Sequence, residues 1–410
     1  MNDLLLMVVL VAAIAIGWLL GRRGASLRNV GPVPSLPSQY YRGLNYLLDG
    51  RPDGAVDAFI NALEVNSETL ETHIALGNLL RKRGEVGRAI RIHQNLLARP
   101  SLPRQQVHQA HLELARDYIS AGLLDRAERL LLDLVSESPE QCRASQRHLL
   151  EIYQSQREWS QAIEVAQALL PRKSLLNGVA TAAGDQSGPM GQAVNLVLAH
   201  YYCEQAAVAR EAGNLAEAGR LLQQALAEDR HCVRASIMQG EVEHAAGNLQ
   251  QAVKALRRVR QQGPDFIPET IAILRQCYES LGERPVLHAY LRDCLAANPS
   301  APLVLAVVEE LRVLEGREAA TEFLSRQLSE HPSLRGLARL ISLQMDGDHS
   351  HGGQVQNNLG LLQVLVDRLV AERPAYRCEH CGFSGRELHW YCLGCKHWGT
   401  IRAIRSARLD

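Results

Sequence analysis

Residues 240–264 read GEVEHAAGNLQQAVKALRRVRQQGP. Gly240 is followed by Ala252 twelve residues later, by Leu256 after four more and by Pro264 after a further eight. Small residues at the first two positions let two paired helices touch, and the larger apolar residue fills the space between them. This spacing is that of the tetratricopeptide repeat, a helix-turn-helix unit of about 34 residues.

The same register recurs along most of the chain, which predicts about eight repeats and a degenerate ninth helix pair at residues 334–372. One repeat cannot bury its apolar face, whereas stacked copies form a superhelix whose concave groove typically binds a peptide. An unrelated alanine-rich bundle would not return so often to one register. The recurring positions hold Gly43, Tyr46, Ala55, Phe59 and Ala62; Leu76, Gly77, Gly84 and Ala89; Ala115, Tyr118, Gly122, Ala127, Leu131 and Pro139; Tyr153, Ala162 and Ala166; and Ala206, Gly213, Ala218, Leu222 and Ala225, with weaker copies ending at Pro299 and Pro332.

Two segments interrupt the repeats. Residues 171–191 are rich in glycine and small side chains, and they are expected to form a flexible loop between the fourth and fifth repeats. Residues 346–353, DGDHSHGG, are expected to form a second loop. Its His349 and His351 are candidate metal ligands, although solvated loop histidines are far commoner.

Near the end of the chain lie four cysteines, Cys378, Cys381, Cys392 and Cys395, in two C-x-x-C pairs ten residues apart. One such pair presents two sulfurs from a tight turn, and two pairs complete a closed tetrahedral site. A site without an open coordination position favours structure or binding over catalysis. The alternatives are two disulfides or chance clustering.

The metal is expected to be zinc, with iron as the alternative, because four cysteinates also bind iron in rubredoxin. Electron-transfer rubredoxins usually have a longer spacer and a glycine after each pair, whereas here Gly382 follows the first pair and Lys396 the second. The short spacer suits a small zinc ribbon that packs against the last helices. The aromatic residues around the cysteines are expected to form its apolar cap, rather than to stack on bases; they are Tyr376, Phe383, Trp390 and Trp398.

At the other end, Leu4–Leu20 is an uncharged apolar run of seventeen residues, which as a helix spans roughly 25 Å. A cleaved signal peptide is the alternative, but its positive charge would precede the run. Here Asp3 precedes the run and Arg22, Arg23 and Arg28 follow it. The positive-inside rule therefore predicts a single-pass membrane anchor with the rest of the chain facing the cytoplasm.

The remaining cysteines agree with a reducing compartment, because they are scattered singly rather than arranged as a disulfide framework. The scattered cysteines are Cys142, Cys203, Cys232, Cys277 and Cys294.

The 44 basic and 44 acidic residues balance, so no global field attracts nucleic acid. Arg402, Arg405 and Arg408 leave nucleic-acid binding only as a minor alternative. No phosphate loop, nucleophile elbow or metalloprotease motif occurs in a suitable context, so we expect no enzyme.

The assembled features resemble the lipopolysaccharide assembly protein B family of Gram-negative bacteria. The resemblance covers nearly the whole chain and is most specific in LGNLLRKRGEVGRAIRIHQNLL at 76–97, AHYYCEQA at 199–206 and the metal module at 376–405. It implies an inner-membrane adaptor that helps the protease FtsH degrade the deacetylase LpxC, and a membrane partner that senses lipopolysaccharide. It carries only the four metal ligands over to this chain, Cys378, Cys381, Cys392 and Cys395.

The expected organisation is an all-α superhelix: an anchor at 1–21, a linker at 22–38, repeats at 39–372 and a rubredoxin-like metal domain at 373–410. Two features depart from the family pattern. Leu393 stands where proline is common in the second C-x-x-C pair, and the loop at 171–191 is longer than the family needs. A general scaffold for membrane complexes and an iron redox protein remain alternatives, and homo-oligomerisation is possible.

Overall fold

The computed structural model describes residues 38–49, 70–98, 102–170, 191–345 and 353–404, together with residues 18, 54, 55 and 58. The chain divides into two compact units, Met1–Leu123 and Leu124–Asp410. Nearly all of the segments predicted as anchor, linker and loops fall outside the described residues, as do His349 and His351. Among the helices that the structure describes, none is both long and apolar enough to cross a membrane.

In the first unit, small residues let neighbouring helices approach closely, as the repeat pattern predicts. A Cβ atom added at Gly77 would lie 2.5 Å from the His93 ring, a distance that no real side chain tolerates. The buried Ala55 packs with Tyr46 and Leu76. The helices are α2 (Ser38–Leu48), α4 (Leu70–Lys82), α5 (Val86–Leu97) and α6 (Arg104–Ser120).

A buried polar network joins three helices of this unit. His93 Nδ1 lies 2.5 Å from Asp117 Oδ2, and both side chains are fully buried. Arg81 pairs with Asp117 and with Glu113, at 2.8 Å in each case. Asp117 thus joins Arg81 of α4 and His93 of α5, and the network fixes both helices against α6.

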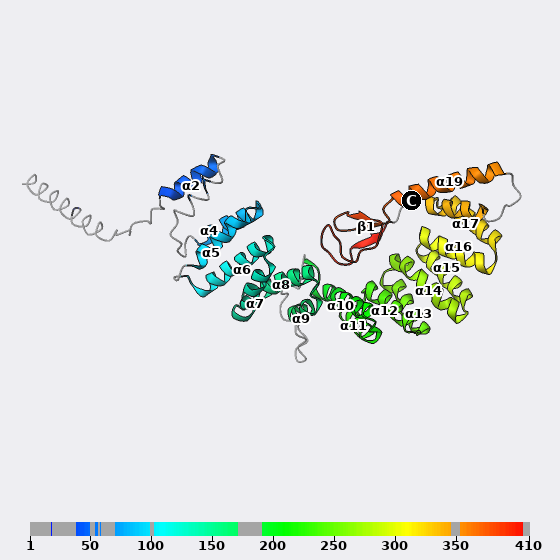
Figure 1. The fold of residues 1–410 in the computed structure, drawn as a ribbon, viewed down its shortest axis with the longest axis horizontal. Helices are drawn as coiled ribbons and strands as arrows, with labels where there is room; N and C mark the ends of the chain where they lie inside the picture. The colour runs from blue at the N-terminus through cyan, green and yellow to red at the C-terminus, as the bar shows by residue number, and fades with distance from the viewer. Residues whose placement is uncertain are drawn as a thin grey trace, which may run out of the picture. The chain divides into compact units, whose positions relative to one another are not determined.

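The second unit consists of helix pairs that follow one another in chain order (Figure 1). Gly240 on α12 packs on Leu256 of α13, where an added Cβ would lie 2.4 Å from Cγ. The α18 and α19 helices form the pair expected at 334–372. The helices are α7 (Leu124–Glu137), α8 (Cys142–Gln156), α9 (Trp159–Leu169), α10 (Val194–Glu211), α11 (Leu215–Glu228), α12 (Val233–Ala245), α13 (Leu249–Gln262), η2 (Pro264–Phe266), α14 (Ile267–Leu281), α15 (Arg284–Ala297), α16 (Ala301–Leu314), α17 (Arg317–Glu330), α18 (Leu334–Met345) and α19 (Gly353–Glu372).

The chain ends in a small antiparallel sheet of strand order β2-β1-β3. Its strands are β1 (Tyr376–Cys378), β2 (Ser384–Gly385) and β3 (Ile401–Ala403). Tyr376 pairs with Gly385 on one side, and Cys378 pairs with Ile401 on the other. This sheet and the two cysteine turns, residues 376–403, are called the ribbon below.

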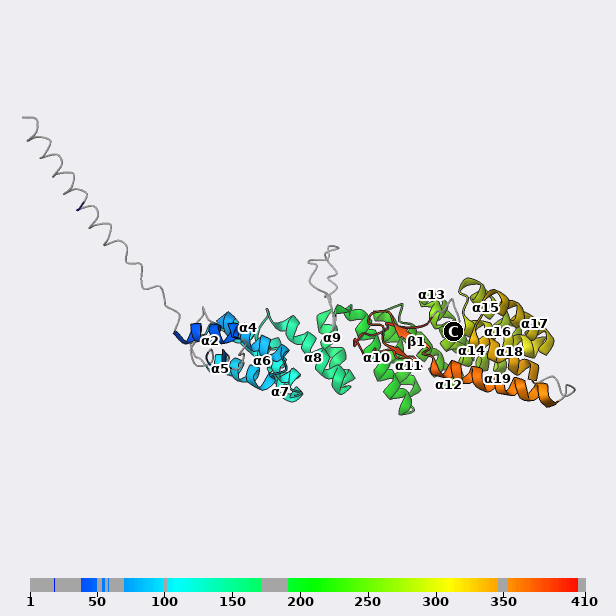
Figure 2. The same ribbon diagram turned by 90° about the horizontal axis from the view of Figure 1, so that it is seen from above.

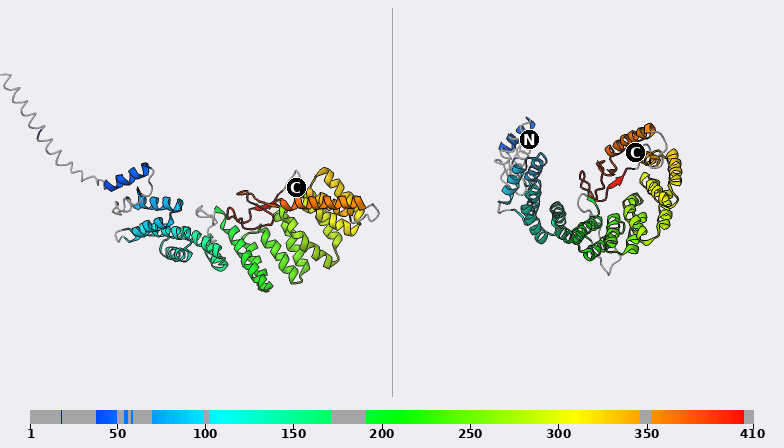
Figure 3. Two further views of the ribbon diagram at one scale, coloured as in Figure 1. Left: turned by 45° about the horizontal axis from the view of Figure 1, so that its top comes forward. Right: turned by 45° about the vertical axis from the view of Figure 1, so that its right-hand side comes forward.

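The expectation that the ribbon packs against the last helices is wrong. Its side chains contact α8, α10, α12, α14 and η2, in the middle of the second unit. The reason is α19, whose 20 residues span about 30 Å. Figures 2 and 3 show α19 running back along the repeats, so that β1 begins on the inner side of the curve formed by this unit.

Candidate metal centre

The two C-x-x-C turns bring their four thiols together. All four sulfur atoms lie within 4.8 Å of one another. Across the turns, Cys378 Sγ lies 3.7 Å from Cys395 Sγ, and Cys381 Sγ lies 3.6 Å from Cys392 Sγ. Four sulfurs at 2.3 Å from one tetrahedral ion would be separated by about 3.8 Å. The donor set therefore fits one zinc or iron ion.

The backbone of each turn is shaped to aim its sulfurs. The residue after each pair adopts the left-handed conformation, with φ of 78° at Gly382 and 60° at Lys396. Lys396 thus adopts a backbone conformation that costs less free energy for glycine than for a residue with a Cβ atom. Space is tight at Gly394, where an added Cβ would lie 3.2 Å from Cys381 Sγ. Leu393, which replaces the common proline, is 64% exposed.

The thiols favour different protonation states when no cation is present. Burial raises the pKa of Cys378, but hydrogen bonds from Thr400 and from the backbone N–H groups of Cys381 and His380 outweigh it and lower the pKa to about 6. Burial and the neighbouring thiols raise the pKa of Cys395 to about 12. Because a bound divalent cation stabilises every thiolate, metal binding would release protons and hold the two turns together.

A second group of donors shares one of these cysteines. His380, Cys395 and His397 have ligand atoms within 4.8 Å of one another. However, the two imidazole rings stack with centroids 4.0 Å apart and an interplanar angle of 23°. Since the lone pairs of stacked rings run nearly parallel, they do not converge on one ion, and the four-thiol set is the better site.

Trp398 anchors the ribbon to the repeats. Its indole Nε1 donates to Gln154 Oε1 at 3.0 Å, and its backbone N–H and carbonyl both bond the Gln192 amide, at 2.7 and 2.9 Å. Its ring stacks on His200, with centroids 4.9 Å apart, and the Arg234 guanidinium lies 5.8 Å from the ring centroid. Only 3% of Trp398 is exposed, so this ribbon residue is buried in the interface with the repeats.

A second set of contacts extends the interface. Trp390 stacks on Phe266 with centroids 5.2 Å apart, and the Arg402 guanidinium lies 4.6 Å from the Phe266 centroid. The Tyr376 hydroxyl donates to Glu269 Oε1 at 2.5 Å. These contacts fix Tyr376, Trp390 and Arg402 against the repeats.

The structure divides the aromatic residues expected to cap the metal site. Phe383 and Tyr376 do pack with the buried cysteines and Ile401. Trp390 and Trp398 instead face the repeats. Sequence reasoning missed the repeat residues that receive them, because Gln154 and Gln192 follow no motif. One available signal was the presence of two tryptophans in a ribbon too small to bury both.

Comparison with known proteins covers both modules. The protein-family model described as rubredoxin metal binding domain matches residues 376–403. Family models of the tetratricopeptide repeat match residues 72–107 and 209–277. Lipopolysaccharide assembly protein B of Escherichia coli is 36% identical over 402 residues, which are 98% of each chain. The chain belongs to the lipopolysaccharide assembly protein B family.

A second member of the lipopolysaccharide assembly protein B family, from Haemophilus influenzae, is 33% identical over 98% of each chain. Among solved structures, a tetratricopeptide repeat protein from Parabacteroides merdae is 12% identical, with a TM-score of 0.29 over 80% of this chain and 97% of that chain. That likeness carries no functional argument. The full-length matches identify this chain as a family member with both the repeats and the metal module.

Proposed function

We propose that this protein is an inner-membrane adaptor that regulates lipopolysaccharide biosynthesis by presenting the deacetylase LpxC to the membrane protease FtsH. The observation that carries the proposal is the match to lipopolysaccharide assembly protein B along 98% of both chains. Stacked repeats provide large surfaces for protein segments, which suits an adaptor. No catalytic step is assigned to the chain.

In this proposal, Leu4–Leu20 tethers the protein to the inner membrane, with the repeats and ribbon in the cytoplasm. Confining adaptor, protease and substrate to one surface raises their effective concentration, so modest affinities suffice. The family resemblance also supports a lipopolysaccharide-sensing membrane partner that relieves the adaptor.

We assign Cys378, Cys381, Cys392 and Cys395 as ligands of one metal ion, with zinc preferred over iron. The bound ion supplies a cross-link between the two cysteine turns. The ribbon is positioned by its own side chains, because Tyr376, Trp390 and Trp398 contact the repeats. A colourless purified protein with one zinc per chain would support this assignment, whereas a visible absorption band with stoichiometric iron would favour a rubredoxin-type redox protein.

The deciding experiment measures the half-life of LpxC in the parent bacterium after depletion of this protein. Rescue is compared for the full chain, a chain lacking residues 1–20, Cys392→Ser, and the control Cys142→Ser, which changes a cysteine outside the ribbon. We expect depletion to lengthen the half-life, and only the full chain and the control to restore it. An unchanged half-life on depletion would refute the proposal and favour a general membrane scaffold.

A further inference from the structure

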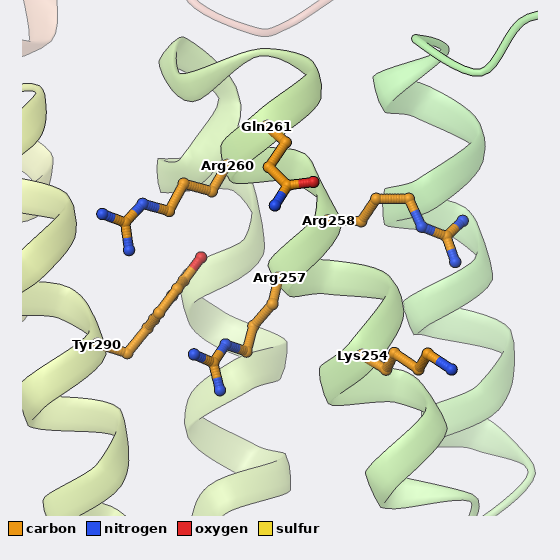
Figure 4. A pocket seen from close by; sticks show the side chains of 6 residues that line it. All are labelled: Lys254, Arg257, Arg258, Arg260, Gln261 and Tyr290. Carbon is orange, nitrogen blue, oxygen red and sulfur yellow. The ribbon is translucent and has the colours of Figure 1, made fainter.

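A cluster of cationic side chains lies away from the ribbon, where α13 faces α15. It lines a cavity of about 510 Å³ that is widely open to solvent. Figure 4 shows Arg257 and Arg260 directed from α13 toward Tyr290 of α15, while Lys254 and Arg258 extend from the other side of α13. The six lining residues are Lys254, Arg257, Arg258, Arg260, Gln261 and Tyr290.

The four cations have no carboxylate partner among the described residues. Elsewhere in the second unit arginines commonly pair with glutamates, as Arg275 does with Glu310 at 2.7 Å. Arg257 instead lies over the Tyr290 ring, with its guanidinium carbon 4.8 Å from the centroid. Positive charges this close along one helix repel each other, and a bound anion would relieve this repulsion.

Tyr290 provides an independent sign of a missing ligand. The residue is 4% exposed and lines the cavity, and no nitrogen or oxygen atom of the described residues accepts from its buried hydroxyl, whose only neighbouring acceptor among them is the Cys294 thiol. Burial raises the pKa of Tyr290, and the Cys294 thiol beside it adds to the effect despite the nearby Arg257 and Arg260. The hydroxyl is therefore neutral at pH 7 and can donate a hydrogen bond, for which a thiol is only a weak acceptor.

We propose that Arg257, Arg260 and Tyr290 bind the phosphoryl group of a phosphate monoester or diphosphate. Two guanidinium groups on either side of the Tyr290 side chain (Figure 4) suit the oxygens of a compact tetrahedral anion. An extended acidic peptide would instead call for cations spaced along a groove. Lys254 and Arg258 add to the positive field, and Tyr290 is the only one of the described lining residues without a charged or amide side chain, so acyl chains are not enclosed.

Two sources share this chemistry, a soluble phosphorylated compound and the phosphate headgroup of a membrane lipid. The proposal does not depend on the adaptor function, because it concerns residues of α13 and α15 alone. Its test therefore uses purified full-length protein and no proteolysis assay.

The experiment titrates the full-length chain with inorganic pyrophosphate by calorimetry. A second arm compares binding to phosphatidylcholine vesicles with and without phosphatidic acid, so that insertion of Leu4–Leu20, common to both, cancels, and a third arm uses a polyglutamate peptide. The variants are Tyr290→Phe, the double variant Arg257→Gln with Arg260→Gln, and the control Arg317→Gln. Arg317 lies on α17 and is exposed, as Arg257 is, so the control removes one surface charge outside the cavity lining.

We expect one saturable pyrophosphate site per chain, roughly ten-fold weaker in Tyr290→Phe, lost in the double variant and unchanged in Arg317→Gln. Because Tyr290→Phe removes an unsatisfied buried hydroxyl, the free variant should be at least as thermally stable as wild type and lose only stabilisation by pyrophosphate. Vesicle binding that requires phosphatidic acid and weakens in Tyr290→Phe would identify the lipid source, whereas pyrophosphate binding alone would identify the soluble source. Absent or non-saturable binding, an equal loss in Arg317→Gln, or stronger Tyr290-dependent binding of polyglutamate would overturn the proposal.

Discussion

The Gln154 side chain accepts a hydrogen bond from the Trp398 indole at 3.0 Å, although 244 residues separate the two in the chain. The same amide oxygen accepts from the Tyr201 hydroxyl, and the amide nitrogen donates to Tyr391 at 2.9 Å. One glutamine of α8 therefore holds the α10 helix and two aromatic residues of the ribbon. This arrangement ties the ribbon to two helices of the second unit.

Replacing Gln154 by alanine should loosen the ribbon. The change leaves the buried donors of Tyr201 and Trp398 without their acceptor, which costs about 1–3 kcal/mol. Hydrogen exchange should then accelerate in residues 376–403 at unchanged metal content. Gln167→Ala is the matched control, because Gln167 donates to Tyr202 at 2.7 Å within the repeats and does not touch the ribbon. Equal effects of the two variants would contradict this interpretation.

Removing the metal should release the ribbon without unfolding the repeats. A strong chelator, or Cys392→Ser, removes the cross-link between the two cysteine turns, and a module this small lacks the core to hold its shape alone. We expect increased solvent quenching of tryptophan fluorescence with nearly unchanged far-ultraviolet circular dichroism. Cys142→Ser should leave both signals unchanged. A large loss of helical signal in Cys392→Ser would show instead that the repeats depend on the ribbon for their stability.

Gly240→Ala should destabilise the second unit, whereas Gly219→Ala should not. The added methyl at Gly240 meets Leu256 at 2.4 Å, while nothing lies within 4 Å of a Cβ at Gly219. Overpacking costs about 1–3 kcal/mol, and a glycine-to-alanine change inside an unobstructed helix gains about 0.5–1 kcal/mol. Urea denaturation measures the difference. The close packing at Gly240 would be disproved if both variants gained stability.

Lys396→Gly should make the metal module more stable. Lys396 has a φ of 60°, a conformation that costs a residue with a Cβ atom about 1–2 kcal/mol. Glycine avoids this cost, but part of the stabilisation is offset because glycine loses more backbone entropy on folding. We expect Lys396→Gly to stabilise the metal module by several tenths of a kcal/mol, which should appear as slower release of the metal to a chelator. Lys396→Ala removes the same charge without relieving the backbone and should release metal at the wild-type rate. Matching rates for glycine and alanine would assign any effect to charge.

Docking of the ribbon should weaken in acid through His200. Burial, followed by the charge of Arg234, lowers the pKa of His200 to about 3 from the usual 6.5. The folded state therefore keeps this imidazole neutral. Its stabilising contribution to the folded state is complete above pH 6.5 and declines as the pH falls toward 3. Near-ultraviolet circular dichroism of the tryptophans should report the loss.

The matched variant for this prediction is His200→Phe, which keeps a ring against Trp398 but cannot titrate. Protonation of the thiolates also releases metal in acid, but that process is common to both proteins. The contribution of His200 is therefore the difference between the two pH profiles. Superimposable profiles would exclude it.

The sequence by itself determined the repeats and the metal module, because both depend on local spacing. Gly77, Gly240 and Ala252 mark places where paired helices touch, and this contact between chain neighbours recurs at a fixed period. The four cysteines carry the geometry of two tight turns in their C-x-x-C spacing. Each pattern joins residues only a short distance apart in the chain.

Only the tertiary structure decided where the ribbon lies. Its position depends on the length and direction of α19, and on contacts such as Trp398 with Gln154 and Trp390 with Phe266. The cavity between Arg257, Arg260 and Tyr290 likewise forms only when Arg257 of α13 meets Tyr290 of α15, in the next helix pair. Such contacts join residues with no fixed separation, so no periodic pattern records them, and side-chain packing in three dimensions selects the partners.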